Sequence, residues 1–240
     1  MKNCSYFKLS NFFLEFFGSF LLVFFAAGAV LTNEFYNGNI GQLMGGFSSG
    51  IILFLLIYCL GNFTRGHVNP AVSYMEYRMG FIKFNTMICY SFFQIIGSIC
   101  AGYSLKIIFG NIANIGSNLP LIKGGYNYLL SFIVEFILSF ILASVIIIIA
   151  YIQKKSLIIL ALCCGLVVCV EVIVFGSITG AAMNPVRAVG PHIAANFPGG
   201  LWIYILGPIS AYLIAIEYYI KFIFKKIHKW LWFYFLWSNK

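Results

Sequence analysis

Long apolar runs separated by short polar stretches make up most of the chain. A helix that crosses a membrane needs about 20 mainly apolar residues to span roughly 30 Å of hydrocarbon. Six stretches are long and apolar enough, at residues 11–31, 41–61, 84–109, 129–152, 157–176 and 201–222. The pattern therefore predicts an all-α membrane protein with six transmembrane helices.

The composition agrees with one integral membrane domain that covers residues 1–240. The chain is 62% hydrophobic and 9% charged, whereas about a quarter of the residues of a soluble domain are charged. No Pro- or Ser-rich linker or charge block divides it. The net charge of +9 comes mainly from lysines after the last apolar run, which indicates contact with anionic lipid rather than nucleic acid. The basic, aromatic tail at 223–240 is predicted to form a cytoplasmic interfacial helix.

The distribution of Lys and Arg predicts that both ends of the chain lie in the cytoplasm, with the plasma membrane as the default location. In that orientation three of the 15 Lys and Arg residues lie on the outer side, namely Lys106, Lys123 and Arg187. The remaining 15 − 3 = 12 lie on the inner side, namely Lys2, Lys8, Arg65, Arg78, Lys83, Lys154, Lys155, Lys221, Lys225, Lys226, Lys229 and Lys240.

The two halves of the chain, at about residues 11–110 and 129–222, are similar to each other. The first span of each half carries a glutamate at a matching place, Glu15 in FFLEFFGSFLLVFF and Glu135 in SFIVEFILSFILAS. After the second span of each half comes a related motif, GHVNPAVS and then AAMNPVRA. Because each half has three spans, an odd number, the second copy must be inverted. Inverted repeats with broken helices point to a site in the middle of the membrane.

Each repeated motif contains an Asn-Pro pair that predicts the start of a short helix. Asn69 and Asn184 suit the N-cap, and Pro70 and Pro185 suit the first helical position. The residues that follow can form about three turns, which is too short to cross a membrane. We therefore expect two half-helices that enter from opposite sides and meet end to end.

The meeting N-termini would carry roughly half a positive charge each. That potential opposes cations at the midplane. The asparagine amides would donate hydrogen bonds to a water molecule there and turn its protons away from its neighbours in the file, which breaks a proton wire.

These features together resemble the aquaporin, or major intrinsic protein, family. The resemblance covers about residues 11–222 and rests on the two glutamates, GHVNPAV, GAAMNPVR and Gly207-Pro208. The first motif reads Asn-Pro-Ala and ends at Ala71, whereas the second reads Asn-Pro-Val and ends at Val186. The stretch GAAMNPVRAVGPHIAAN is similar to the plant nodulin-type intrinsic proteins. The resemblance implies an aquaporin-like fold with two re-entrant half-helices, one pore per subunit and a homotetramer.

The resemblance also implies the residues of the selectivity filter. Arg187, three positions after the second motif asparagine, matches the constriction arginine of the family. Counting from the two asparagines puts the other filter positions at Ser49, Val172 and Ala181. Water-strict members carry bulky aromatic and histidine groups at these positions, and glycerol facilitators carry two aromatic ones. Neither set is present, so we expect a wide filter.

The loops that lead into the half-helices are expected to line the pore, and the resemblance implies that Glu15 and Glu135 support them by accepting hydrogen bonds from their backbone N–H groups. The implied pore-lining residues of these loops are Gly66, His67, Val68, Gly180 and Ala182.

Three further polar residues have open roles. Glu171, next to Val172, is expected either to cap the end of its helix or to reach the pore mouth and pair with Arg187. His67 lines the inner vestibule or acts as a cap, and His192 is expected on the surface of the second half-helix.

The sequence thus predicts a passive channel for water and small uncharged solutes such as glycerol, urea and undissociated boric or other metalloid acids. Two alternatives remain, a secondary active transporter with the same kind of repeat and a non-conducting scaffold on the same fold. No catalytic set, metal-binding spacing or cofactor motif appears in the sequence, so we expect neither an enzyme nor a cofactor. The expected partners are water, small neutral solutes, lipid and identical subunits, without nucleic acid.

Overall fold

The structure is a computed structural model that describes residues 7–121 and 127–238, with side chains described up to Lys221. In chain order its α-helices are α1 (Leu9–Phe35), α2 (Gln42–Thr64), α3 (Pro70–Arg78), α4 (Phe84–Phe109), α5 (Tyr128–Ile146), α6 (Leu157–Thr179), α7 (Pro185–Ala194) and α8 (Leu201–Ser238). A short 3₁₀ segment, η1 (Ala113–Gly116), follows α4, and a π-helical segment, η2 (Ile147–Ile152), continues α5.

Six helices in the described part of the chain are long and apolar enough to cross a membrane. They are α1, α2, α4, α5 together with η2, α6, and α8 up to Lys221. The predicted spans agree with these helices closely, and the largest difference is at the end of α1, which reaches Phe35 rather than residue 31. The all-α membrane fold is confirmed.

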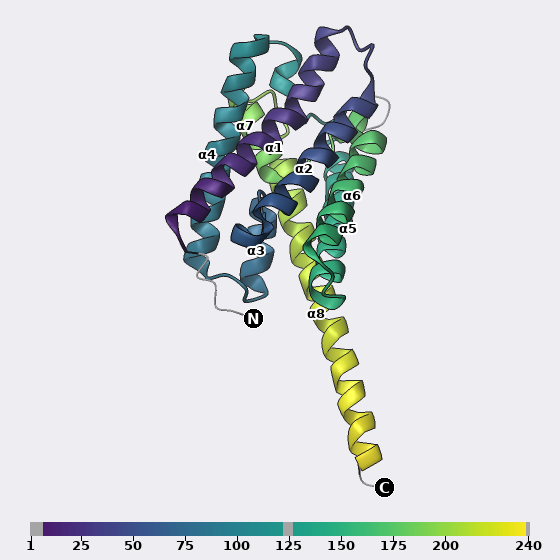
Figure 1. Cartoon of the computed structure of the whole chain (residues 1–240). Helices are drawn as coiled ribbons and strands as arrows, with labels where there is room; N and C mark the ends of the chain where they lie inside the picture. Colours follow the sequence, from purple (N-terminus) through teal and green to yellow (C-terminus); the bar gives the residue numbers. More distant parts are fainter. Residues whose placement is uncertain (1–6, 122–126, 239–240) are drawn as a thin grey trace.

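The two halves of the chain use the same series of elements, two long helices, a half-helix and a third long helix. α1 packs along α4 in the first half, and α5 packs along α8 in the second, while α2 and α6 lie side by side between them (Figure 1). The half-helix α7 lies against α4, and α3 contacts α4 and α8. α7 also contacts α1 and α8, so each half-helix contacts long helices from both halves of the chain.

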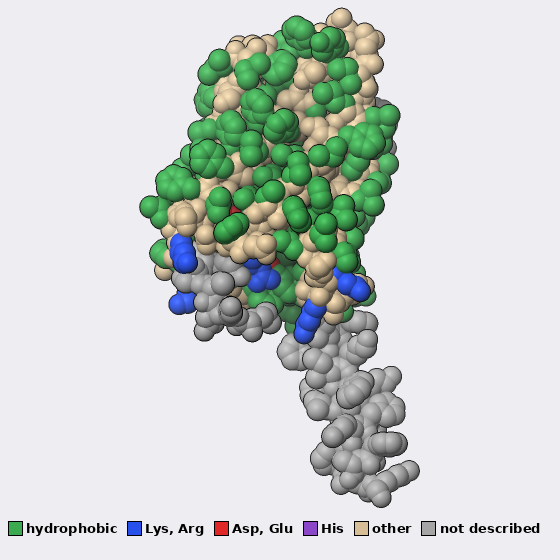
Figure 2. Space-filling view, in the orientation of Figure 1, with side chains coloured by type: hydrophobic (Ala, Val, Ile, Leu, Met, Phe, Trp, Pro, Cys, Tyr) green, Lys and Arg blue, Asp and Glu red, His purple; other side chains and the backbone are tan. Residues whose placement is uncertain are grey.

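The outer surface has the character expected of a lipid-facing protein. Figure 2 shows hydrophobic side chains over the flank of the bundle and Lys and Arg side chains gathered near its lower end. Lys8 precedes α1, Lys83 precedes α4, and Lys154 and Lys155 lie between η2 and α6. Because successive spans alternate in direction, these connections all lie at one end of the bundle.

Glycines allow the helices to cross at close range. A Cβ atom on Gly50 of α2 would lie 2.5 Å from the carbonyl oxygen of Gly165 in α6, and one on Gly165 would lie 2.7 Å from that of Gly50. At the contact of α7 with α4, a Cβ on Gly190 would lie 2.0 Å from the carbonyl oxygen of Ser98. Small residues at crossings are what lets helices in a membrane bring their backbones together.

The backbone of the tail is helical up to Ser238 and continuous with the last span. The backbone of α8 continues as one helix from Leu201 to Ser238 and leaves the bundle at its lower end (Figure 1). The side chains of 223–240 lie outside the described residues. Their location in the headgroup layer stays a prediction.

The close contact of α7 with α4 generates a first testable prediction. We expect Gly190→Ala to lower the stability of the detergent-solubilised protein by about 1–3 kcal/mol, because the added methyl overlaps backbone atoms that cannot rotate away. Thermal aggregation followed by size-exclusion chromatography measures the shift.

Gly28→Ala is the matched control, since its added Cβ would lie 3.4 Å from a single side-chain carbon of Leu105. Equal melting behaviour of the two variants would contradict the argument.

Candidate functional site

Both half-helices begin as their Asn-Pro motifs predict. The side-chain oxygen of Asn69 accepts a hydrogen bond from the N–H of Ala71 at 2.9 Å, and Pro70 occupies the first turn. Asn184 accepts from the N–H of Val186 at 3.1 Å, and Pro185 occupies the first turn of α7. Each asparagine thus satisfies a helix N–H that would otherwise lack a partner.

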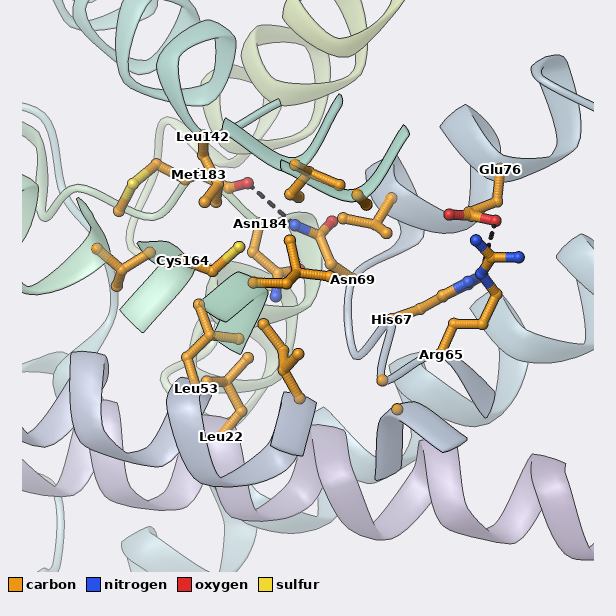
Figure 3. A pocket seen from close by; sticks show the side chains of 18 of the residues that line it. Leu22, Leu53, Arg65, His67, Asn69, Glu76, Leu142, Cys164, Met183 and Asn184 are labelled. Carbon is orange, nitrogen blue, oxygen red and sulfur yellow. Dashed lines mark hydrogen bonds and ion pairs between the residues drawn. The ribbon is translucent and has the colours of Figure 1, made fainter. Parts of the chain in front are cut away.

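The same two asparagines also join the half-helices to each other. Asn69 Nδ2 donates to the carbonyl oxygen of Met183 at 3.2 Å (Figure 3), and Asn184 Nδ2 donates to that of Val68 at 2.8 Å. Each bond runs from one motif to the loop of the other. A side-chain amide has two N–H donors, so one donor on each asparagine is left over after this crossed pair is made.

Glu15 holds the loop that precedes α3. Its carboxylate accepts from the backbone N–H of His67 at 3.1 Å and of Val68 at 2.8 Å. It also accepts from Nε2 of Gln94 at 2.6 Å, and the same amide nitrogen donates to Ser73 at 3.2 Å. The glutamate is fully buried, so these donors replace the water that a carboxylate would otherwise bind.

Glu135 holds the loop that precedes α7 in the same way. Its oxygens accept from the N–H of Ala182 at 3.0 Å and of Met183 at 3.0 Å. The hydroxyl of Thr179 donates a third bond at 2.7 Å. The two buried carboxylates therefore do equivalent work in the two halves.

Two cavities meet beside Arg187, near the N-terminus of α7. The first, of about 300 Å³, is lined by Arg65, His67, Asn69 and Asn184 among others, and we call it the inner cavity and the second the outer cavity after the orientation that the sequence predicts. The outer cavity, of about 240 Å³, has a polar wall that includes Asn33, Gln42, Asn118 and Gly180. The residues common to both linings are Ala26, Ser49 and Arg187. These three mark the junction of the two cavities.

Arg187 lies at this junction and is held from a loop that sequence reasoning missed. Its Nη1 donates to the carbonyl oxygen of Gly116 at 3.0 Å. Gly116 has a φ of 67°, and a Cβ there would lie 2.6 Å from the carbonyl oxygen of Ala27. Only glycine suits both conditions. A guanidinium has five N–H donors, so several of them remain for a solute at the junction.

Of the other predicted filter residues, Ser49 lines both cavities and Val172 lines the outer one. The side chain of Ala181 belongs to the buried cluster that also contains Leu138 and Leu142 and is in neither cavity lining, so its place in the filter stays a prediction. The backbone at Ala181 is left-handed, with a φ of 44°, and its N–H donates to the hydroxyl of Thr179 at 3.1 Å.

The neighbours of Ala181 divide between the cavities, since Gly180 lines the outer one and Ala182 the inner one. In the first loop Gly66 and His67 line the inner cavity. The side chain of Val68 is fully buried in a cluster with Leu22 and Leu56, while its carbonyl oxygen accepts the hydrogen bond from Asn184; that Val68 lines the pore stays a prediction.

Gln42 is a further residue of the outer cavity that the sequence did not reveal. Its Nε2 donates to the carbonyl oxygen of Val172 at 2.9 Å, across 130 positions of the chain. A Cβ on Gly176 would lie 1.9 Å from that nitrogen, so the absence of a side chain at Gly176 makes the room that Gln42 occupies.

Glu171 and His192 do not lie where the sequence placed them. Glu171 is buried, and neither carboxylate oxygen has a hydrogen-bond partner among the described residues. It neither caps α6, which continues to Thr179, nor pairs with Arg187, and it lines neither cavity. His192 is fully buried rather than on a surface, with its ring nitrogens 2.9 Å and 3.2 Å from the carbonyl oxygens of Ala188 and Gly199.

The contrast between Glu135 and Glu171 generates the second prediction. We expect Glu135→Gln to lower stability by about 1–3 kcal/mol, because an amide N–H then faces backbone donors that need an acceptor. Glu171→Gln is the matched control in a neighbouring span and loses no described hydrogen bond. Thermal unfolding in detergent measures both, and a larger loss in the control would contradict the assigned support role.

Comparison with solved structures supports the fold. The aquaglyceroporin from Plasmodium falciparum matches with a TM-score of 0.73 and 24% identity, over 88% of this chain and 95% of that chain. At this identity the likeness shows the fold alone.

Comparison with curated sequences finds plant proteins. "Aquaporin NIP2-1" from Zea mays is 33% identical over 191 residues, which cover 80% of this chain and 63% of that protein. "Aquaporin NIP3-1" from Oryza sativa subsp. japonica is 30% identical over 196 residues, which cover 81% and 62%. The chain thus spans slightly less than two thirds of the length of these relatives.

The family model described as "Major intrinsic protein" matches residues 3–219. That match covers the two glutamates, both Asn-Pro motifs, five complete spans and the sixth up to residue 219, and the chain belongs to the major intrinsic protein family.

Proposed function

We propose that this protein is a passive channel for water and small uncharged solutes, with the two cavities as the halves of its pore. The observation that carries this proposal is the crossed pair of hydrogen bonds between Asn69 and Asn184 and the opposite loops. It fixes two helix N-termini and two spare amide donors in the wall of the inner cavity.

The electrostatics of that point suit neutral cargo. The N-termini of α3 and α7 carry roughly half a positive charge each, and Arg187 adds a full one at the junction. A cation entering either cavity meets this potential in surroundings that screen it poorly. A neutral hydroxyl or amide instead accepts hydrogen bonds from the amides and the guanidinium.

The side chains at the junction favour a wide filter. Ser49 and Val172 occupy positions where a bulky ring would narrow the passage, and Ser49 belongs to both cavity linings. With a hydroxyl, a short apolar wall and a guanidinium, the junction can bind one polar edge and one apolar edge of a small molecule. Glycerol, urea and undissociated boric or other metalloid acids have that size and chemistry.

The alternative of a secondary active transporter loses its main support. Coupling to an ion gradient needs ionisable groups near the transport path, and Glu171 was the candidate. Glu171 lines neither cavity, and the carboxylate that does line the inner one, Glu76, is ion-paired with Arg65 at 3.2 Å. A non-conducting scaffold would be recognised by a lack of swelling in every solute.

Assembly and orientation complete the proposal. We propose a homotetramer with one pore in each subunit, and both termini in the cytoplasm of a cell whose plasma membrane holds the channel. The grouping of Lys8, Lys83, Lys154 and Lys155 at one end of the bundle supports this orientation.

Stopped-flow measurements on proteoliposomes test the function. In an impermeant osmolyte we expect the proteoliposomes to shrink faster than empty liposomes. In glycerol or urea we expect the initial shrinkage to be followed by swelling, because the solute enters through the channel. Rates that do not change when a proton or sodium gradient is dissipated distinguish a channel from a coupled transporter. Rates equal to those of empty liposomes in all solutes would favour the non-conducting scaffold.

The filter assignment generates the third prediction. We expect Ser49→Trp to lower glycerol and urea permeability by about tenfold or more, because an indole at the junction excludes solutes by size. Phe47→Trp is the matched control, since Phe47 is exposed on the outside of the same helix. Unchanged glycerol flux in Ser49→Trp would show that the filter lies elsewhere.

A further inference from the structure

The end of the inner cavity away from the filter carries a second arginine. Arg65 lines this cavity together with Glu76, Tyr151 and Lys155. It directly follows α2 as its C-cap, at a φ of 68°, in the left-handed region. That conformation favours glycine and costs other residues roughly 1 kcal/mol.

The second half of the chain makes the same turn with glycine. Gly180 is the C-cap of α6 at a φ of 85°. It precedes Asn184 by four positions, as Arg65 precedes Asn69. The turn itself therefore does not need a side chain. In the first half the long side chain of Arg65 occupies this place despite the backbone cost. Its presence there points to a use for the guanidinium group.

Arg65 and the three side chains around it form what we call the Arg65 clamp, defined as Arg65, Glu76, Phe81 and Tyr151. Arg65 Nε lies 3.2 Å from Glu76 Oε2 (Figure 3), and Nη2 donates to the Tyr151 hydroxyl at 3.1 Å. The guanidinium carbon lies 4.9 Å from the centre of the Phe81 ring and 5.5 Å from that of Tyr151. The two rings stack on each other at 4.6 Å.

These contacts join separate elements around one opening. Arg65 comes from the end of α2, Glu76 from α3, Phe81 from the turn before α4, and Tyr151 from η2. π-helical turns are rare and frequently occur at functional sites. Here η2 carries Tyr151 at the end of the α5 span, where it can receive the hydrogen bond from Arg65.

Arg65 lies in the cavity lining and is not a fully buried structural residue. Its side chain is 26% exposed, whereas that of Glu76 is 4% exposed. The Glu76 carboxylate is thus covered by protein, and it binds the guanidinium group, which remains partly exposed. Phe81 and Tyr151 fix its plane, because cation–π contacts restrict a guanidinium to the ring face. A long side chain held in this way narrows the opening that it borders.

We propose that Arg65 is a second specificity-determining residue, and that the Arg65 clamp forms a constriction at the inner end of the pore that limits the size of the solute. This inference rests on the proposed channel function. It implies two guanidinium groups in series, with Arg187 at the junction of the cavities and Arg65 at the inner opening. Solutes wider than the clamp pass only when its contacts loosen.

The test is a size series in proteoliposomes, with water, urea, glycerol, erythritol and xylitol as probes. We expect Arg65→Gly to raise the permeability of the largest solutes by about tenfold, with a much smaller effect on water, since size discrimination by a wall of a few atoms is about that large. Arg65→Gly also suits the left-handed backbone, so the variant keeps the turn that Gly180 makes in the other half.

Arg78→Ala is the matched control. Arg78 also pairs with a glutamate, Glu217, at 2.9 Å, but this pair is exposed and lines neither cavity. We expect its size series to equal that of the unchanged protein. Arg65→Lys keeps the charge but loses the planar fork, and we expect an intermediate series.

Tyr151→Phe guards against a folding failure of the first variant, because it removes only the hydroxyl that Arg65 binds. We expect it to raise erythritol flux by a smaller factor than Arg65→Gly. A size series in both variants that equals that of the unchanged protein overturns the inference.

The outcome is separable from that of the proposed function. If the unchanged protein conducts water but no solute, the proposed solute class is wrong. In that case a gain of urea or glycerol flux in Arg65→Gly still supports the inner constriction, and the absence of any gain overturns it.

Discussion

Non-helical backbone in a membrane needs a hydrogen-bond partner for every buried N–H, and the rest of this structure depends on how that need is met. The loops before α3 and α7 interrupt the spans, so their amides have no helical partners. Glu15 and Glu135 supply acceptors from within the first span of each half. Each loop is thereby fixed to a rigid helix, and the half-helix that follows it starts at a defined depth.

Fixed loops turn two short helices into one functional unit. The crossed bonds of Asn69 and Asn184 work only because Val68 and Met183 present their carbonyl oxygens at the right places. Glycine contacts complete the arrangement, since α7 could not approach α4 with a side chain at Gly190. Positioning at the pore therefore comes from buried polar bonds and from close helix contacts that act together.

The two arginines at the cavities are likewise each held by hydrogen-bond or ion-pair partners in the protein. Arg187 is tied to a backbone carbonyl in the loop between α4 and α5, and Arg65 is tied to a covered carboxylate and two rings. A guanidinium held by one side keeps its other donors for passing solutes. In our proposal the two arginines act at different points: Arg187 donates hydrogen bonds to the solute at the junction, and Arg65 limits the size of solute that passes the inner opening.

Hydropathy, the repeated glutamates and the Asn-Pro pairs in the sequence by themselves determined the six spans and the two half-helices, whereas the place of Arg187 was implied by the family resemblance. These are local signals, because membrane transfer energy and helix capping depend on neighbouring residues. Counting from the asparagines, together with the family resemblance, also pointed to Ser49 and Val172, and both lie in a cavity lining. Counting could not show that the side chains of Ala181 and Val68 lie in buried apolar clusters, that Glu171 is buried apart from both cavities, that Gly116 holds Arg187, or that Gln42 lines the outer cavity. Only the tertiary structure decided those points and assembled the Arg65 clamp, because each depends on the turn of a loop or on contacts between segments far apart in the chain.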